Sequence, residues 1–455
     1  MFKLLLISIT ILVLSGCQNE ITPPANFWEL HKVPNLSNED YVEFMVNFFL
    51  EDLHYLEEHL LSNSPLINVA ARRTGVETSF RFELASNDTY DDGSFMWAPL
   101  RREPSDTYVR LAAELFSQNI LQNLFPSGFG HMRPISPELA INTIMILHLC
   151  DNDLTFVSFP HLTDNCSADH HHHIFRNPNV ISFYNPDLSN AENHEILFLN
   201  EGLSSIPNIE TRIIIPDSVA YVSSRHFLSS PEVLALELAQ LLEFYEEISD
   251  FNHLIIDFRN HLGGMSLFAE DLFFSPLISE PLEVSIHQFF RKPFINLLRE
   301  NPNDIYENLN LVPATTFIGE NNFYNLHPDD IEFLDYSSVS RRTIYPASIN
   351  FPFSGRIWFL VNSQTASAAE LAVLHAMSID FATVVGTNTS GIMPATRSYI
   401  ALPNSGIIFQ YDVGYFIDET GRSLEEFGIT PHYPNRPGLD ALNTVLQMIE
   451  EIELN

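Results

Sequence analysis

Two short runs of apolar residues constrain the fold of this chain most strongly. They are "HLIIDF" at 253–258 and "RIWFLV" at 356–361. Strands that are apolar at successive positions, without alternation, are typical of a sheet that is covered on both faces. A helical pattern follows each run, and strand and helix patterns alternate along most of the chain after Thr211. The sequence therefore predicts an α/β fold with a parallel or mixed sheet.

The turns that follow these two strands carry the polar groups of interest. The first turn holds Gly263 and Gly264, and the second leads through Ser367 into a helix. With Glu370 three residues later, Ser367 fits a capping box, which is an ordinary helix start. Alternatively, Ser367 is a nucleophile at the positive end of the helix dipole. In that case the free amide of Ala368, together with one from Gly263 or Gly264, would bind the oxyanion.

Four segments, in this order and spacing, resemble the tail-specific (C-terminal processing) protease family of serine peptidases. They are "HLIIDFRNHLGGM", "TASAAE", "VVGTNTSGI" and "GRSLEEFGITPHYP". The resemblance covers roughly 211–450. It implies a ClpP/crotonase-like core, an α/β spiral of βαβ units, in which Ser367 matches the nucleophile. It also implies that the substrates are peptides or proteins and that the reaction needs neither a metal nor an organic cofactor.

The chain departs from this family at the residue that usually activates the serine. Most members use a Ser-Lys dyad, and Ile392 stands where the lysine is expected. The lysines of the chain are Lys3, Lys32 and Lys292, and all three are placed in other regions. A Ser-Lys dyad is therefore excluded. A second departure is Arg259-Asn260-His261, where the family has Arg-Gly-Asn.

The resemblance to the tricorn-like branch of the family implies a histidine base in place of the lysine. His131 follows a helical pattern upstream of the core, and it would take the proton from Ser367 and return it to the leaving group. Glu425, placed by the register of the Gly428 motif, would orient His131, with Glu426 as the fallback. The alternatives are a capped loop histidine and a solvated pair of acidic residues.

The N-terminus has the proportions of a secretory signal. Lys3 precedes an apolar run at 4–14, which is too short to span a bilayer because a spanning helix takes about 20 residues. "LSGC" resembles a bacterial lipobox ending at Cys17, so we expect a lipid anchor on Cys17 and a location in the bacterial cell envelope, periplasmic or at the outer surface. A plain signal peptide is the alternative.

At 455 residues the chain is long enough for several domains. The expected order is a lipoprotein signal peptide at 1–17, a tether at 18–37, a helical N-terminal domain at 38–150, an irregular connecting region at 151–210, and the core at 211–450 with an insertion at 266–354. The region between His131 and Thr211 shows no PDZ pattern. The insertion is predicted to form a lid or a substrate-facing subdomain.

Three further features bear on possible ligands. The net charge of −36 excludes nucleic acid as a partner. The run His170–His173 lacks the usual spacing of metal ligands, so we expect a solvated loop and no metal site. Cys150 and Cys166 would form a disulfide in an oxidising compartment or remain free thiols. The predicted function is a serine peptidase. A catalytically inactive lipoprotein of the same fold, which binds peptides or apolar ligands, is the alternative.

Overall fold

The computed structural model describes residues 51–74 (except 53 and 57), 133–134, 205–299, 310–393, 397–401 and 408–454. Its centre is a six-stranded sheet in the order β13-β9-β8-β4-β3-β2. The strands are β2 (Glu210–Ile215), β3 (Val219–Ser223), β4 (His253–Asp257), β8 (Arg356–Val361), β9 (Thr383–Gly386) and β13 (Tyr433–Pro434). All neighbours pair in parallel except β2 and β3. The predicted α/β class is confirmed.

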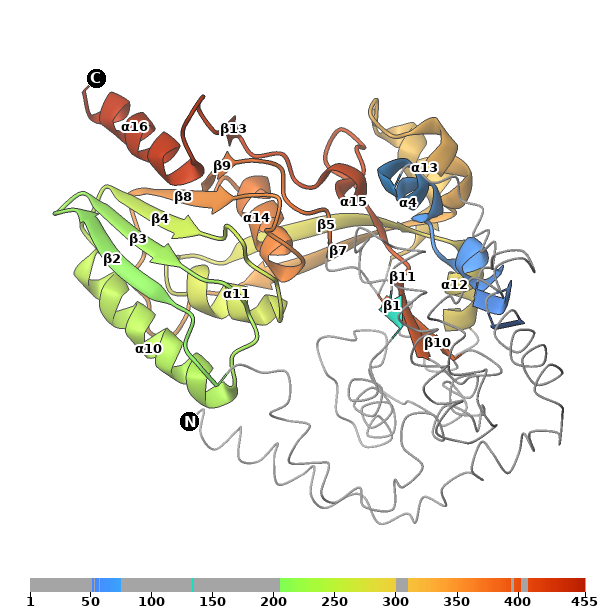
Figure 1. Ribbon diagram of the computed structural model, residues 1–455, viewed down its shortest axis with the longest axis horizontal. Coiled ribbons are helices and arrows are strands. Elements are labelled where there is room, and N and C mark those ends of the chain that lie inside the picture. The colour runs from blue at the N-terminus through green and yellow to red at the C-terminus, as the bar shows by residue number, and fades with distance from the viewer. Residues whose placement is uncertain are drawn as a thin grey trace, which may run out of the picture.

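Helices cover both faces of this sheet (Figure 1). Helices α10 (Pro231–Glu247), α11 (Ser266–Phe273) and α14 (Ala368–Ser378) contribute to the core on one face. Helix α16 (Ala441–Glu453) covers the other face. Along β4, Leu254 and Ile256 enter the first core and Ile255 enters the second. The strand is apolar at successive positions because both of its faces are buried.

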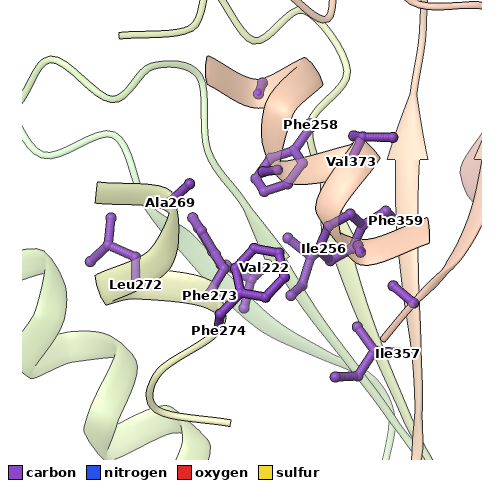
Figure 2. Packing of buried hydrophobic residues seen from close by; sticks show 14 of the residues in the cluster. Val222, Ile256, Phe258, Ala269, Leu272, Phe273, Phe274, Ile357, Phe359 and Val373 are labelled. Atoms are coloured by element: carbon purple, nitrogen blue, oxygen red, sulfur yellow. The ribbon is translucent and has the colours of Figure 1, made fainter. Parts of the chain in front are cut away.

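The larger of the two cores is rich in phenylalanine. Phe273 and Phe274, at the end of α11, lie with Phe258 and Phe359 from the sheet in the cluster shown in Figure 2. The rings of Phe258 and Phe273 meet edge to face at a centroid distance of 5.2 Å. Each fully buried side chain of this size contributes about 1.5–3 kcal/mol relative to exposure. This packing fixes α11 and α14 against this face of the sheet.

The expected insertion, 266–354, forms a second sheet and also contributes to the first core. Its sheet has the order β12-β5-β7-β6, with β5 (Leu282–Phe290), β6 (Val312–Pro313) and β7 (Tyr336–Ile344). The fourth strand, β12 (Tyr415–Phe416), comes from beyond the insertion. Helices α12 (Lys292–Arg299) and α13 (Ala314–Glu320) and the 3-10 helix η7 (Pro328–Phe333) lie between its strands in sequence. The insertion is therefore joined to the core by α11 and by β12.

Two described elements come from the region before the core. Helix α4 (Ile67–Thr74) lies against α15 (Leu424–Phe427) and η7. Strand β1 (Arg133–Pro134) pairs with β11 (Ile408–Asp412), which also pairs with β10 (Arg397–Ala401). The signal peptide and tether, Cys17, His131, Cys150, Cys166 and His170–His173 lie outside the described residues. Within the described ranges, no helix has the length and apolar character that a membrane span requires.

Candidate active site

Ser367 stands at the junction between β8 and α14, at the carboxyl edge of the main sheet. Its backbone has φ 56° and ψ −121°, a conformation that L-residues other than glycine rarely adopt. The residue is 6% exposed. The Glu370 carboxylate accepts a hydrogen bond from the Ser367 amide at 3.1 Å. The Glu370 half of the predicted capping box is therefore formed, although the backbone of Ser367 is not that of an ordinary cap, which is extended.

The glycine turn after β4 lies directly against Ser367. A Cβ built on Gly263 would lie 2.6 Å from the Ser367 Cβ and 3.2 Å from the Ala368 amide nitrogen. On Gly264 it would lie 2.3 Å from the backbone oxygen of Phe227. Both glycines have positive φ, at 84° and 131°. No side chain fits here, so the structure brings Gly263 and Ala368 together around Ser367, as the sequence predicts.

His261, at the position where the family has asparagine, bears on the prediction for the oxyanion hole. Its Nδ1 accepts a hydrogen bond from the Gly263 amide at 3.0 Å, and its Nε2 lies 3.3 Å from the Ser224 hydroxyl. The Gly263 amide therefore already has an acceptor in this structure, and its role as an oxyanion donor stays a prediction. Within the described residues, the amides of Gly264 and Ala368 have no hydrogen-bond acceptor, so these two remain the candidate donors.

The ring of His261 is fully buried and neutral. It packs on Phe227 at a centroid distance of 4.1 Å and meets the edge of Phe258 at 5.4 Å. Its pKa is lowered to about 3, chiefly by burial and to a smaller extent by the neighbouring His226 and Arg225. A proton on Nδ1 would also face the Gly263 amide, which is itself a donor. His261 therefore acts as a fixed acceptor that holds the glycine turn.

Glu370 binds a second turn, which returns from β9 to Ser367. In addition to the Ser367 amide, its carboxylate accepts from the Thr389 hydroxyl at 2.5 Å, the Gly391 amide at 2.8 Å and the Ser390 hydroxyl at 3.0 Å. Burial raises the pKa of Glu370, and these hydrogen bonds oppose the rise. The S-x-x-E pattern in the sequence identifies Glu370 only as a helix cap, and it does not predict the hydrogen bonds to Thr389, Ser390 and Gly391.

The turn at 389–392 occupies the place where most of the family carries the lysine. The carbonyl oxygen of Ile392 accepts from the Ser367 amide at 2.7 Å. The turn therefore holds the backbone of Ser367 and brings no amine to its hydroxyl. Lys292, the one lysine within the described residues, begins α12. This arrangement agrees with the exclusion of a Ser-Lys dyad.

Glu425 lies in the short helix α15 and is 2% exposed. Its two carboxylate oxygens accept from the Phe416 amide at 3.0 and 3.2 Å, and the Ser423 hydroxyl donates at 3.3 Å. Burial raises its pKa well above the ordinary value. Glu426, the fallback, is held by the Arg72 guanidinium in an ion pair of 2.6 Å. This pair leaves Glu425 as the better candidate to orient a histidine.

His131 is not among the described residues, so its role stays a prediction. The chain resumes two residues later in β1, where Arg133 and Pro134 pair with Gln410 and Phe409 of β11. Strand β11 continues into β12, whose Phe416 amide binds Glu425. The strand that follows His131 is thus joined through β11 to the strand that holds Glu425. Among the described residues, no group of histidine, cysteine and acidic side chains could hold a metal ion.

Comparison with known proteins gives one family match. Residues 218–434 match the model of peptidase family S41. Solved structures to which the chain shows similarity include a peptidase from Parabacteroides merdae described as putative, at 15% identity over 56% of this chain and 68% of that chain, with a TM-score of 0.38. A lipoprotein from Streptococcus agalactiae is 13% identical over 70% of this chain and 97% of that chain, with a TM-score of 0.38.

A third structure is mature CPAF complexed with lactacystin. It is 18% identical over 56% of this chain and 57% of that chain, with a TM-score of 0.35, so the match spans little more than half of that protein. The family model confirms the resemblance to the C-terminal processing peptidases, whereas the tricorn-like sub-branch stays a prediction. The α/β region that carries Ser367, residues 218–434, is thus similar to peptidase family S41.

Proposed function

We propose that this chain is a serine peptidase that cleaves peptide or protein substrates through an acyl-enzyme on Ser367. The observation that carries the proposal is the backbone of Ser367, at φ 56°, pressed against the Gly263 turn. Such a conformation costs about 1–3 kcal/mol and persists where the surrounding structure enforces it. A serine that only caps a helix needs no such strain. Its occurrence within a region similar to family S41 supports a nucleophile.

The proposed reaction follows from the groups around Ser367. The Ser367 hydroxyl attacks the substrate carbonyl while His131 accepts its proton, and the amides of Ala368 and Gly264 donate to the oxyanion. His131 then protonates the leaving amine as the C–N bond breaks. Water, deprotonated by His131, then attacks the acyl carbon, and His131 gives this proton to the Ser367 oxygen as the ester C–O bond breaks. Glu425 orients His131. None of these reaction steps uses a metal ion or an organic cofactor.

The alternative is a catalytically inactive protein that binds peptides or apolar ligands on the same fold. Two observations favour it: the Gly263 amide is occupied by His261, and Ile392 replaces the lysine of the Ser-Lys branch. Burial also raises the pKa of Glu425, which reduces the fraction of ionised carboxylate available to orient a histidine. A reactive Ser367 would decide between the two functions.

A fluorophosphonate probe tests the proposal on the full chain. We expect covalent labelling of the wild type and none of Ser367→Ala. Ser363→Ala is the matched control, because Ser363 is an exposed serine in the same turn, and it should label like the wild type. An unlabelled wild type would refute the peptidase. Labelling of His131→Ala at the wild-type rate would refute the histidine as base while leaving the class intact.

We also propose that the protein is anchored in the bacterial envelope through a lipid on Cys17. The support is the short apolar run that ends in "LSGC". Growth of an expressing bacterium with labelled palmitate should label the wild type and leave Cys17→Ala unlabelled. Equal labelling of both proteins, or of neither, would contradict a lipid anchor on Cys17.

A further inference from the structure

The last turn of helix α4 carries two arginines, Arg72 and Arg73, which bind different parts of the core. Arg72 forms ion pairs with Asp330 of η7 at 2.8 Å and with Glu426 of α15 at 2.6 Å. Arg73 instead donates to two main-chain oxygens, those of Glu425 and Ser390, each at 2.6 Å. The pairs made by Arg72 add to the docking of the helix, which also buries its Ile67 and Val69 side chains. The bonds made by Arg73 join two segments that both belong to the proposed site.

The chain is shaped to admit the Arg73 guanidinium. A Cβ built on Gly391 would lie 2.9 Å from Nη1 of Arg73 and 2.8 Å from the carbonyl oxygen of Glu425. Gly391 also has a φ of 76°, which favours glycine. A side chain at this position would therefore displace the guanidinium from the two carbonyl groups that it bridges.

A short series of hydrogen bonds connects Ser367 to the bridge that Arg73 forms between the carbonyl groups of Glu425 and Ser390. The hydroxyl of Ser390 and the amide of Gly391 both donate to the Glu370 carboxylate, and the next carbonyl, that of Ile392, accepts from the Ser367 amide. Burial lowers the pKa of Arg73, and the neighbouring carboxyl groups of Glu370 and Glu425 oppose this lowering. Arg73 thus contacts the turn that holds Ser367 and the helix that carries Glu425 at the same time.

We propose that Arg73 is a positioning residue, which fixes the turn at 389–392 and helix α15 relative to each other and thereby holds Ser367 in its reactive geometry. The inference deepens the proposed function and rests on it. It also makes the part of the chain before the core a component of the site, because Arg73 reaches the core only when α4 is docked on α15. A core with α4 undocked would have an unreactive Ser367.

The test compares Arg73→Ala with Arg72→Ala in the full chain. We expect Arg73→Ala to slow fluorophosphonate labelling of Ser367 roughly 10- to 100-fold, the loss that a small misplacement of a reacting group produces. Arg72→Ala loses its ion pairs and keeps the bridge, so its labelling rate should stay close to that of the wild type. Methylguanidinium added to Arg73→Ala should restore part of the rate, which a purely structural loss would not allow.

Hydrogen exchange gives a second readout that does not need a reactive serine. The amides of Gly391 and Ser367 should exchange faster in Arg73→Ala than in Arg72→Ala. If Arg73→Ala fails to fold, Arg73→Lys decides, because one ammonium cannot bridge both carbonyls as the planar fork does and labelling should still be slowed. Wild-type labelling and exchange in the folded Arg73 variant, or equal losses in both arginine variants, would overturn the inference. An unlabelled wild type would overturn the proposed function alone.

Discussion

The buried ring of His261 predicts that this fold loses stability in mild acid, and that one substitution removes much of the loss. In the native state the pKa of His261 is about 3, while the unfolded chain has an ordinary value of about 6.5. Below pH 6.5 the histidine therefore binds a proton in the unfolded state but stays neutral in the native state. Well below pH 6.5 stability falls by about 1.4 kcal/mol per pH unit, and the loss between pH 6.5 and 4.5 is about 2 kcal/mol because the slope at pH 6.5 is only half as steep.

His261→Asn is the perturbation that isolates this effect. The amide oxygen of asparagine keeps an acceptor for the Gly263 amide, and asparagine does not titrate. The smaller side chain loses contact with Phe227, and this cost is the same at every pH. The stability difference between variant and wild type therefore has a constant part from packing and a pH-dependent part from the histidine.

Urea unfolding at several pH values between 4.5 and 7 measures the difference. We expect the free energy of unfolding of His261→Asn, relative to the wild type, to rise by about 2 kcal/mol as the pH falls from 6.5 to 4.5. His327→Asn is the control, because that ring is 41% exposed. A difference that stays constant with pH would refute the reasoning. So would an NMR titration of the His261 ring near pH 6.5 in the folded protein.

Two further predictions concern the glycine beside Arg73 and a buried carboxyl group on α11. Gly391→Ala should lower the free energy of unfolding, measured in urea, by about 1–3 kcal/mol, because its Cβ would meet Glu425 and Arg73 and its φ is positive. Gly319→Ala is the control. Gly319 lies in open space on α13, so this change should be neutral or stabilising by up to about 1 kcal/mol. Burial raises the pKa of Glu270 to about 7, despite its 2.9 Å ion pair with Arg342. Between pH 4.5 and 7 the native state therefore binds a proton that the unfolded state has lost. Stability falls as the pH rises through that window. Glu270→Gln should remove this fall, which is on the order of 2 kcal/mol after allowance for solvent screening of the pair; an equal fall in both proteins would contradict the assignment.

The sequence predicted the main sheet because its strands are apolar at successive positions. The runs at 253–258 and 356–361 became β4 and β8, each followed by a turn and a helix, and the two turns met because carboxyl ends of parallel strands share one edge. Ser367, Gly263 and Ala368 were brought together for that reason. Strand β12 has two residues, which is too short for any periodicity to reveal.

The details of the site depend on contacts that no local pattern contains. The bond between the His261 ring and the Gly263 amide depends on the rotamer of one side chain, so counting amides in a glycine turn could not show that one is occupied. Glu370 looked like an ordinary cap because its other partners follow about twenty residues later, at 389–391. Arg73 binds main-chain oxygens, which every residue carries, so sequence gives no sign of its partners.

Pairing between β12 and β5 has a consequence for how the protein is made. Phe289 and Phe290 are synthesised long before Tyr415, the residue opposite Phe289. As the chain leaves the ribosome, β5 can pair with β7 on one side, but the backbone N–H and C=O groups on its other side stay unpaired until Tyr415 and Phe416 have emerged. Completion of this sheet is therefore a late, long-range step, and a nascent chain paused before residue 415 would be the species most exposed to aggregation or to a chaperone.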